Sequence, residues 1–130
     1  MKLEDEKKIK LALSELQTLK EKRGGVLLDF HKKCANDSKL LEAFIQQYDA
    51  CNAPQNAVME RKYRELILLA LGCANGVKTT IMTHAKLAQQ NGATVEEIAE
   101  VLRLVFFYCG ASKLIPAVEI FDVLPGSEEL

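Results

Sequence analysis

The stretch from Glu65 to His84, ELILLALGCANGVKTTIMTH, decides the fold of this chain. It begins with an apolar run, is interrupted by Asn75-Gly76, and then continues with a second set of regularly spaced apolar residues. An Asn-Gly pair is typical of a helix end, because glycine adopts the left-handed backbone conformation at little cost. The stretch therefore predicts two consecutive helices, residues 57–74 and about Val77 to Gln90.

The apolar run Leu66–Leu71 carries no polar face. A helix that is apolar all round is expected to be covered on every side. This run is therefore predicted to form the core of the domain.

The rest of the chain shows the same three- to four-residue apolar periodicity, and no segment alternates as a β-strand would. Helix-stop signals and capping residues, such as Thr94 with Glu97 three residues later, separate the segments. We therefore expect an all-α fold of six or seven helices. The further helices are predicted at residues 3–22, 26–35, from Asp37 or Ser38 to the loop at 51–56, from Thr94 to Cys109, and from about Ser112 or Pro116 to Pro125.

Composition restricts the class of protein. At 130 residues, with 48% hydrophobic residues, one domain is expected. The 17 basic and 18 acidic residues nearly cancel, which disfavours nucleic acid or an anionic membrane as a partner. The charged N-terminal residues, the short apolar runs and four cysteines without a CxxC pair favour a cytoplasmic protein with no membrane span and no disulfide framework.

Glu65 is followed 12, 15 and 19 residues later by Val77, Thr80 and His84, a spacing that resembles the Glu, Cys, Cys and His of the thiol site in AhpD-like proteins. On a helix that begins near residue 77, the last three share one face. Two cysteines at positions 77 and 80 would lie in the first helical turn, where the helix dipole lowers a thiol pKa. The chain has neither cysteine, while His84 for proton transfer and Glu65 to orient it are both present.

With this spacing, the segments Arg64 to His84, Asn91 to Leu102 and Tyr108-Cys109-Gly110 resemble the carboxymuconolactone decarboxylase and AhpD-like family. The resemblance covers about residues 55–124, with residues 1–54 as an N-terminal helical extension of the single domain 1–130. It implies an all-helical fold that assembles as a homo-oligomer, commonly a trimer or hexamer, with sites near subunit interfaces.

The family has a peroxidase branch and a decarboxylase branch, and the resemblance implies a different chemistry for each. In the peroxidase branch Glu65 and His84 match the proton-relay residues, but Val77 and Thr80 replace the two thiols, and neither side chain can be oxidised to a sulfenic acid. The decarboxylase branch does not use the thiol pair and carries a histidine at the position of His84. Its substrate is an anionic lactone, for which basic residues are available by type: Arg64, Lys78 and Lys86.

The leading hypothesis is proton transfer or decarboxylation on a small carboxylate-bearing substrate, without a metal or organic cofactor. His84 would be the general acid/base and Glu65 its orienting carboxylate. The substrate-lining residues would be Val77, Thr80 and Met82. Two alternatives remain open: a thiol-dependent peroxidase that uses Cys73 or Cys109, and a catalytically degenerate binding or assembly module.

Overall fold

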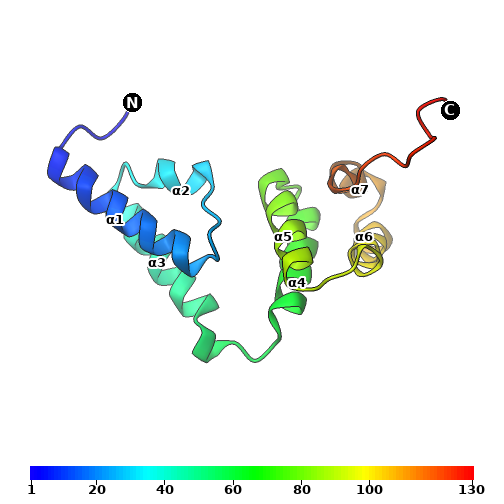
Figure 1. Ribbon diagram of the computed structural model, residues 1–130, viewed down its shortest axis with the longest axis horizontal. Helices are drawn as coiled ribbons and strands as arrows, with labels where there is room; N and C mark the ends of the chain where they lie inside the picture. The colour runs from blue at the N-terminus through cyan, green and yellow to red at the C-terminus, as the bar shows by residue number, and fades with distance from the viewer. The chain divides into compact units, whose positions relative to one another are not determined.

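The computed structural model describes residues 1–130 and is all-α, with seven helices, two short 3-10 helices and no strand (Figure 1). The all-α prediction is confirmed. The elements are α1 (Glu6–Lys22), α2 (Asp29–Cys34), α3 (Ser38–Asn52), η1 (Pro54–Asn56), α4 (Arg61–Asn75), α5 (Lys78–Gln90), α6 (Val95–Cys109), α7 (Ala111–Ala117) and η2 (Val118–Ile120).

The chain forms two compact units, Met1–Ala57 and Val58–Leu130. The division follows η1, at the end of the loop that the sequence marks with Pro54. The assignment of residues 1–130 to a single domain stays a prediction. No helix is both long enough and apolar enough to cross a lipid bilayer.

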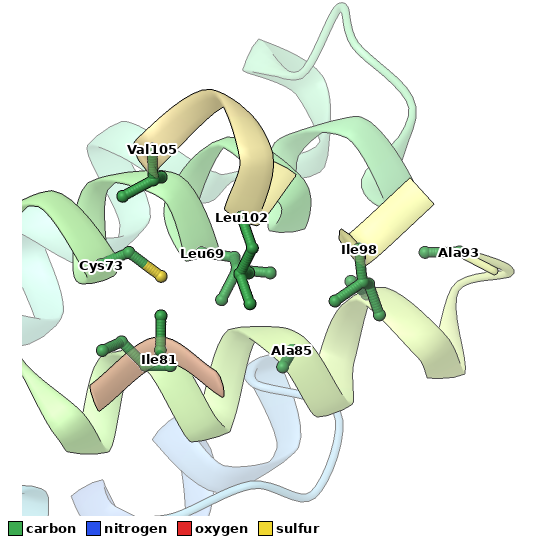
Figure 2. Close-up of a cluster of buried hydrophobic side chains, with 10 residues drawn as sticks. Leu69, Cys73, Ile81, Ala85, Ala93, Ile98, Leu102 and Val105 are labelled. Carbon is green, nitrogen blue, oxygen red and sulfur yellow. The ribbon is translucent and has the colours of Figure 1, made fainter. Parts of the chain in front are cut away.

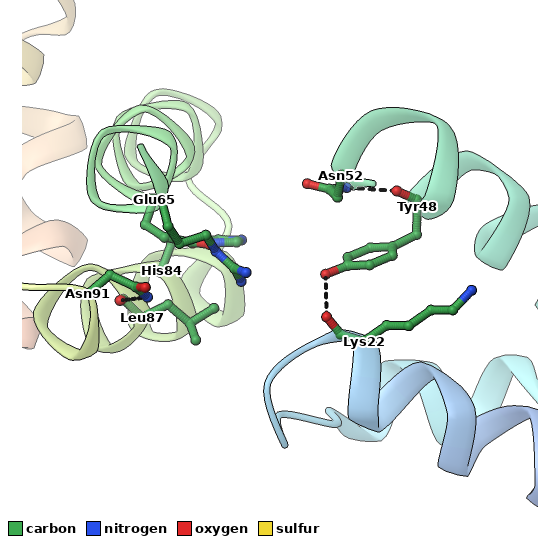
Figure 3. A network of polar contacts seen from close by, with 8 residues as sticks. Lys22, Tyr48, Asn52, Glu65, His84, Leu87 and Asn91 are labelled. Atoms are coloured by element: carbon green, nitrogen blue, oxygen red, sulfur yellow. Dashed lines mark hydrogen bonds and ion pairs between the residues drawn. The ribbon is translucent and has the colours of Figure 1, made fainter. Parts of the chain in front are cut away.

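The N-terminal unit consists of α1, α2 and α3, and α3 packs against both other helices. Asp5 caps α1 and Asp37 caps α3, each by accepting a backbone N–H with its carboxylate. The Tyr48 hydroxyl donates to the Lys22 carbonyl, and Asn52 donates to the Tyr48 carbonyl (Figure 3). The core of this unit is formed by Ala12, Leu16, Leu19, Ala35 and Leu41.

The C-terminal unit is built on α4 and α5, which pack along each other and are covered by α6 and α7. Leu69, Cys73, Ile81 and Leu102 point into the space between α4, α5 and α6 (Figure 2). All four are at most 2% exposed, so this apolar cluster is closed to water. Burial of side chains of this size, at about 1.5–3 kcal/mol for each large one, holds the two helices that carry the candidate site.

Two glycines set the geometry of the α4–α5 pair. Gly76 ends α4 with a positive φ of 68°, where any other residue would be strained, so the chain can turn directly into α5. Gly72 lies at a close approach of the two helices: a Cβ added there would be 2.8 Å from Thr80 Cγ2 and 3.2 Å from the Ile81 backbone nitrogen. A side chain at position 72 would therefore force the helices apart.

Several predicted helix limits need correction. Residues 57–60 are not helical, because α4 begins only at Arg61. The helix predicted from residue 26 begins at Asp29, and the one predicted from residue 3 begins at Glu6. The predicted loop at 51–56 is shorter, because α3 continues to Asn52 and η1 follows.

The last helix begins next to Ser112, one of its two predicted starts, but ends earlier than predicted. It begins at Ala111, directly after Gly110, and ends at Ala117, after which only the single turn η2 is helical. Pro116 lies inside α7 rather than in its first turn. Proline has no N–H to donate to the preceding turn, so α7 lacks one helical hydrogen bond at this position.

The expectation that Leu66–Leu71 is covered on every side is also wrong for this chain. Leu69 is fully buried, but Ile67 is 45% exposed and Leu71 is 53% exposed. The apolar run thus has one face in the core and another that no part of the C-terminal unit covers.

Candidate functional site

Glu65 and His84 meet across the α4–α5 pair. Glu65 Oε2 lies 2.6 Å from His84 Nδ1, although the two residues are 19 apart in sequence (Figure 3). Their side chains are only 4% and 17% exposed. The expected contact between these two residues is therefore present, and it lies on the α4 face that also carries Gly72.

Glu65 has a second partner, Arg61, which lies one helical turn before it in α4. Arg61 Nε donates to Glu65 Oε1 at 2.6 Å, while His84 occupies the other carboxylate oxygen. A buried carboxylate is costly unless it is paired and hydrogen-bonded. Here both oxygens have a partner, which explains why Glu65 tolerates burial.

The balance of these effects keeps Glu65 ionised. Burial alone would raise the pKa of its carboxyl group, but the hydrogen bonds from His84 and Arg61, together with their charges, outweigh burial. The pKa of Glu65 therefore lies below its ordinary value. Glu65 is a fixed negative charge near neutral pH and can only accept hydrogen bonds.

The ionised carboxylate determines the tautomer of His84. Because Glu65 can only accept, Nδ1 of His84 must carry the proton in their 2.6 Å contact. The second ring nitrogen, Nε2, is then the one that exchanges protons with a ligand. A histidine oriented by a buried carboxylate in this way is suited to general acid/base catalysis.

The predicted substrate-lining residues do not form one surface. Val77 caps the N-terminus of α5 and is 43% exposed, whereas the γ-methyl group of Thr80 lies over Gly72. Met82 is 42% exposed but lies two residues from His84 on α5, so it points away from the histidine face. The structure brings Thr80 close to the face of α4 that carries Glu65. Met82 does not lie near this face.

The two cysteines of the thiol alternative, Cys73 and Cys109, lie on α4 and α6. Cys73 is fully buried in the core cluster (Figure 2), and burial raises the pKa of its thiol. A raised thiol pKa disfavours the thiolate, which is the reactive form. Cys109, at the end of α6, is half-buried, and none of the four cysteines is in a disulfide.

Sequence reasoning missed Arg61. It named Arg64, Lys78 and Lys86 as basic residues, of which Lys78 and Lys86 are exposed on α5. A signal was present, because Arg61 and Glu65 are four residues apart on one helix, a spacing at which side chains of opposite charge meet. Arg64, which is next to Glu65 in the sequence, was named instead of Arg61.

Other parts of the chain do not add to this site. A groove of about 360 Å³ lies in the N-terminal unit between α1 and α2, and none of the predicted site residues lines it. His31 packs edge-on against the rings of Phe30 and Phe44. No group of three or more His, Cys, Asp or Glu side chains is arranged to hold a metal ion.

Comparison with known proteins identifies the family. The profile of the Carboxymuconolactone decarboxylase family matches residues 38–122, about two thirds of the chain. The chain is also 30% identical over 70 residues to "Uncharacterized protein MJ1511" of Methanocaldococcus jannaschii; that match spans 54% of this chain and 65% of the relative. No solved structure matches the chain. The chain belongs to the carboxymuconolactone decarboxylase family.

Proposed function

We propose that this protein is an acid/base enzyme that acts on a small carboxylate-bearing substrate, with decarboxylation as its reaction. The observation that carries the proposal is the 2.6 Å contact between the buried Glu65 carboxylate and His84 Nδ1. Membership of the carboxymuconolactone decarboxylase family supports it. The thiol alternative is disfavoured, because the nearest cysteine, Cys73, is buried and its thiol pKa is raised.

The proposed step is balanced by one proton. The bond between the substrate carbon and its carboxylate breaks, CO₂ leaves, and the electron pair stays on the carbon, where a neighbouring carbonyl group delocalises it. His84, protonated on both nitrogens, donates its Nε2 proton to this carbon and regains a proton from water. Glu65 keeps the ring in place and stabilises the imidazolium form that donates.

We also infer that the protein works as a homo-oligomer. A row of α6 side chains, Leu104, Phe107 and Tyr108, is between 61% and 88% exposed, and Ile67 and Leu71 on α4 are exposed as well. An apolar surface of this kind is typical of a protein interface. Sedimentation velocity on the wild type and on Phe107→Asp measures it: the variant should sediment as a smaller species, and a monomeric wild type would contradict the inference.

Carboxymuconolactone is the first substrate to assay, by CO₂ release and loss of the lactone. His84→Gln should lower kcat by about 100-fold or more, the usual contribution of a general acid or base. Glu65→Gln should lower kcat less and shift its pH profile, because the neutral amide no longer stabilises the imidazolium form. Glu100→Gln, which removes an exposed carboxylate on α6, is the matched control and should behave as wild type.

The outcomes separate the hypotheses. Full activity in His84→Gln would show that the reaction does not use this histidine. If the folded wild type released no CO₂, the decarboxylase proposal would be wrong, and the degenerate binding or assembly module would be the better reading. Hydroperoxide consumption that is lost in Cys73→Ser would favour the thiol alternative instead.

A further inference from the structure

Arg61 uses only part of its side chain to hold Glu65. Its Nε makes the 2.6 Å bond to Glu65 Oε1, and the structure gives the two terminal nitrogens no partner. The side chain remains 41% exposed, although the carboxylate beside it is only 4% exposed. The guanidinium therefore has one edge in the buried network and another edge in solvent.

This exposed edge belongs to the same hydrogen-bonded network as His84. Glu65 Oε1 binds Arg61 and Glu65 Oε2 binds His84, so the guanidinium and the imidazole flank a single carboxylate group. A ligand bound to the terminal nitrogens of Arg61 would thus contact the network that orients the His84 ring. The guanidinium presents paired N–H groups in a planar fork, which matches the two oxygens of a carboxylate.

The charges favour an anion at this position. Arg61 and Glu65 neutralise each other, and His84 adds a positive charge whenever it is protonated for proton donation. Lys78 and Lys86 are exposed on α5, and no contact joins either of them to Glu65 or His84. Arg61 is held by Glu65, the same carboxylate that binds His84.

We propose that Arg61 anchors a substrate carboxylate that the reaction leaves in place, while its Nε positions Glu65. This inference rests on the proposed function. The anchored group cannot be the one that departs, because pairing that carboxylate with a guanidinium would stabilise the ground state and slow its loss.

Binding of a simple dicarboxylate tests the anchor without any turnover. Succinate is the probe and uncharged succinamide its control, with binding followed by the NMR shifts of the His84 ring. Succinate should bind the wild type and succinamide should not. Arg61→Gln should weaken succinate binding by about 10- to 100-fold, the usual value of hydrogen bonds to a charged group, and Arg61→Lys should weaken it less. Arg103→Gln, which removes an exposed arginine on α6, should leave binding unchanged.

A second signal separates anchoring from a purely structural role. The His84 Nδ1 proton, which lies in the bond to Glu65, gives its own NMR resonance. Loss of binding with this resonance retained supports the anchor. Loss of binding only in variants that also lose the resonance would show that Arg61 acts solely by holding Glu65, and equal succinate binding by Arg61→Gln or none by the wild type would overturn the proposal outright.

Turnover then distinguishes this inference from the proposed function. Arg61→Lys should raise the KM for carboxymuconolactone more than it lowers kcat, because the interaction is made in both the ground state and the transition state. If His84→Gln abolishes turnover while both Arg61 variants keep the wild-type KM, the function stands and the anchor is wrong. If His84→Gln stays active, the proposed function is wrong, and the succinate titration still decides the anchor.

Discussion

Replacing Gly72 by alanine should destabilise the C-terminal unit, although alanine is the better helix former. The helix-propensity gain is about 1 kcal/mol. Against it, the new Cβ would lie 2.8 Å from Thr80 Cγ2 and 3.2 Å from the Ile81 backbone nitrogen. Because a backbone atom cannot move aside as a flexible side chain can, α4 and α5 must separate, and overpacking of this kind costs about 1–3 kcal/mol. We expect a net loss of up to about 2 kcal/mol.

Urea unfolding of four proteins measures this: wild type, Gly72→Ala, Thr80→Ser and the double variant. The midpoint should fall in Gly72→Ala at unchanged m-value. Thr80→Ser removes the methyl group that Cβ would meet, so the double variant should recover part of the loss, and the cycle gives the coupling energy between the two positions. A Gly72→Ala protein that is about 1 kcal/mol more stable than wild type would refute the close approach, since propensity alone would then explain the result.

Two further predictions concern the buried histidine His31 and the accessibility of the cysteines. The pKa of the buried His31 is lowered from 6.5 to about 4 by burial and by Arg23, so the unfolded chain binds the proton more readily. The neutral, buried His31 therefore stabilises the folded state fully above pH 6.5, and about 3 kcal/mol of the free energy of unfolding is lost as the pH falls to about 4. His31→Gln should not show this loss in urea titrations. Parallel pH profiles of the two proteins would contradict the burial argument. Alkylation mapped by mass spectrometry should modify the exposed Cys51 first and the buried Cys73 only on unfolding, whereas early labelling of Cys73 would show that the core opens to solvent.

Most of the fold could be predicted because its signals are local. The capping box of Thr94 and Glu97 is present, with the Thr94 hydroxyl and the Glu97 carboxylate each accepting from the other's backbone N–H. Asp37 caps α3, and Gly76 ends α4 in the left-handed conformation, as the sequence predicted. These features depend on neighbours within four residues, so the sequence contains all the information that they require.

The errors arose where the outcome depends on surroundings. Pro116 inside α7 and the exposed face of Ile67 and Leu71 cannot be read from periodicity, because an apolar run does not say whether its cover is in the same chain. Which arginine pairs with Glu65 depends on the direction of the side chains, and the sequence does not give that direction. Arg61 and Arg64 are both within one turn of Glu65, and only the structure shows that Arg61 Nε binds the carboxylate.

The structure also gives Thr80 a different role from the expected one. Helical spacing placed it on the face of His84, and there it was assigned to the substrate. Its methyl group instead occupies the space that Gly72 leaves open, so it belongs to the packing that brings α4 and α5 together. Glu65 is two helical turns before Gly72, and His84 is one turn after Thr80, which makes the 2.6 Å contact of the site a consequence of this close approach. The solvent-facing side of the network is then the exposed guanidinium edge of Arg61, where the substrate carboxylate is proposed to bind.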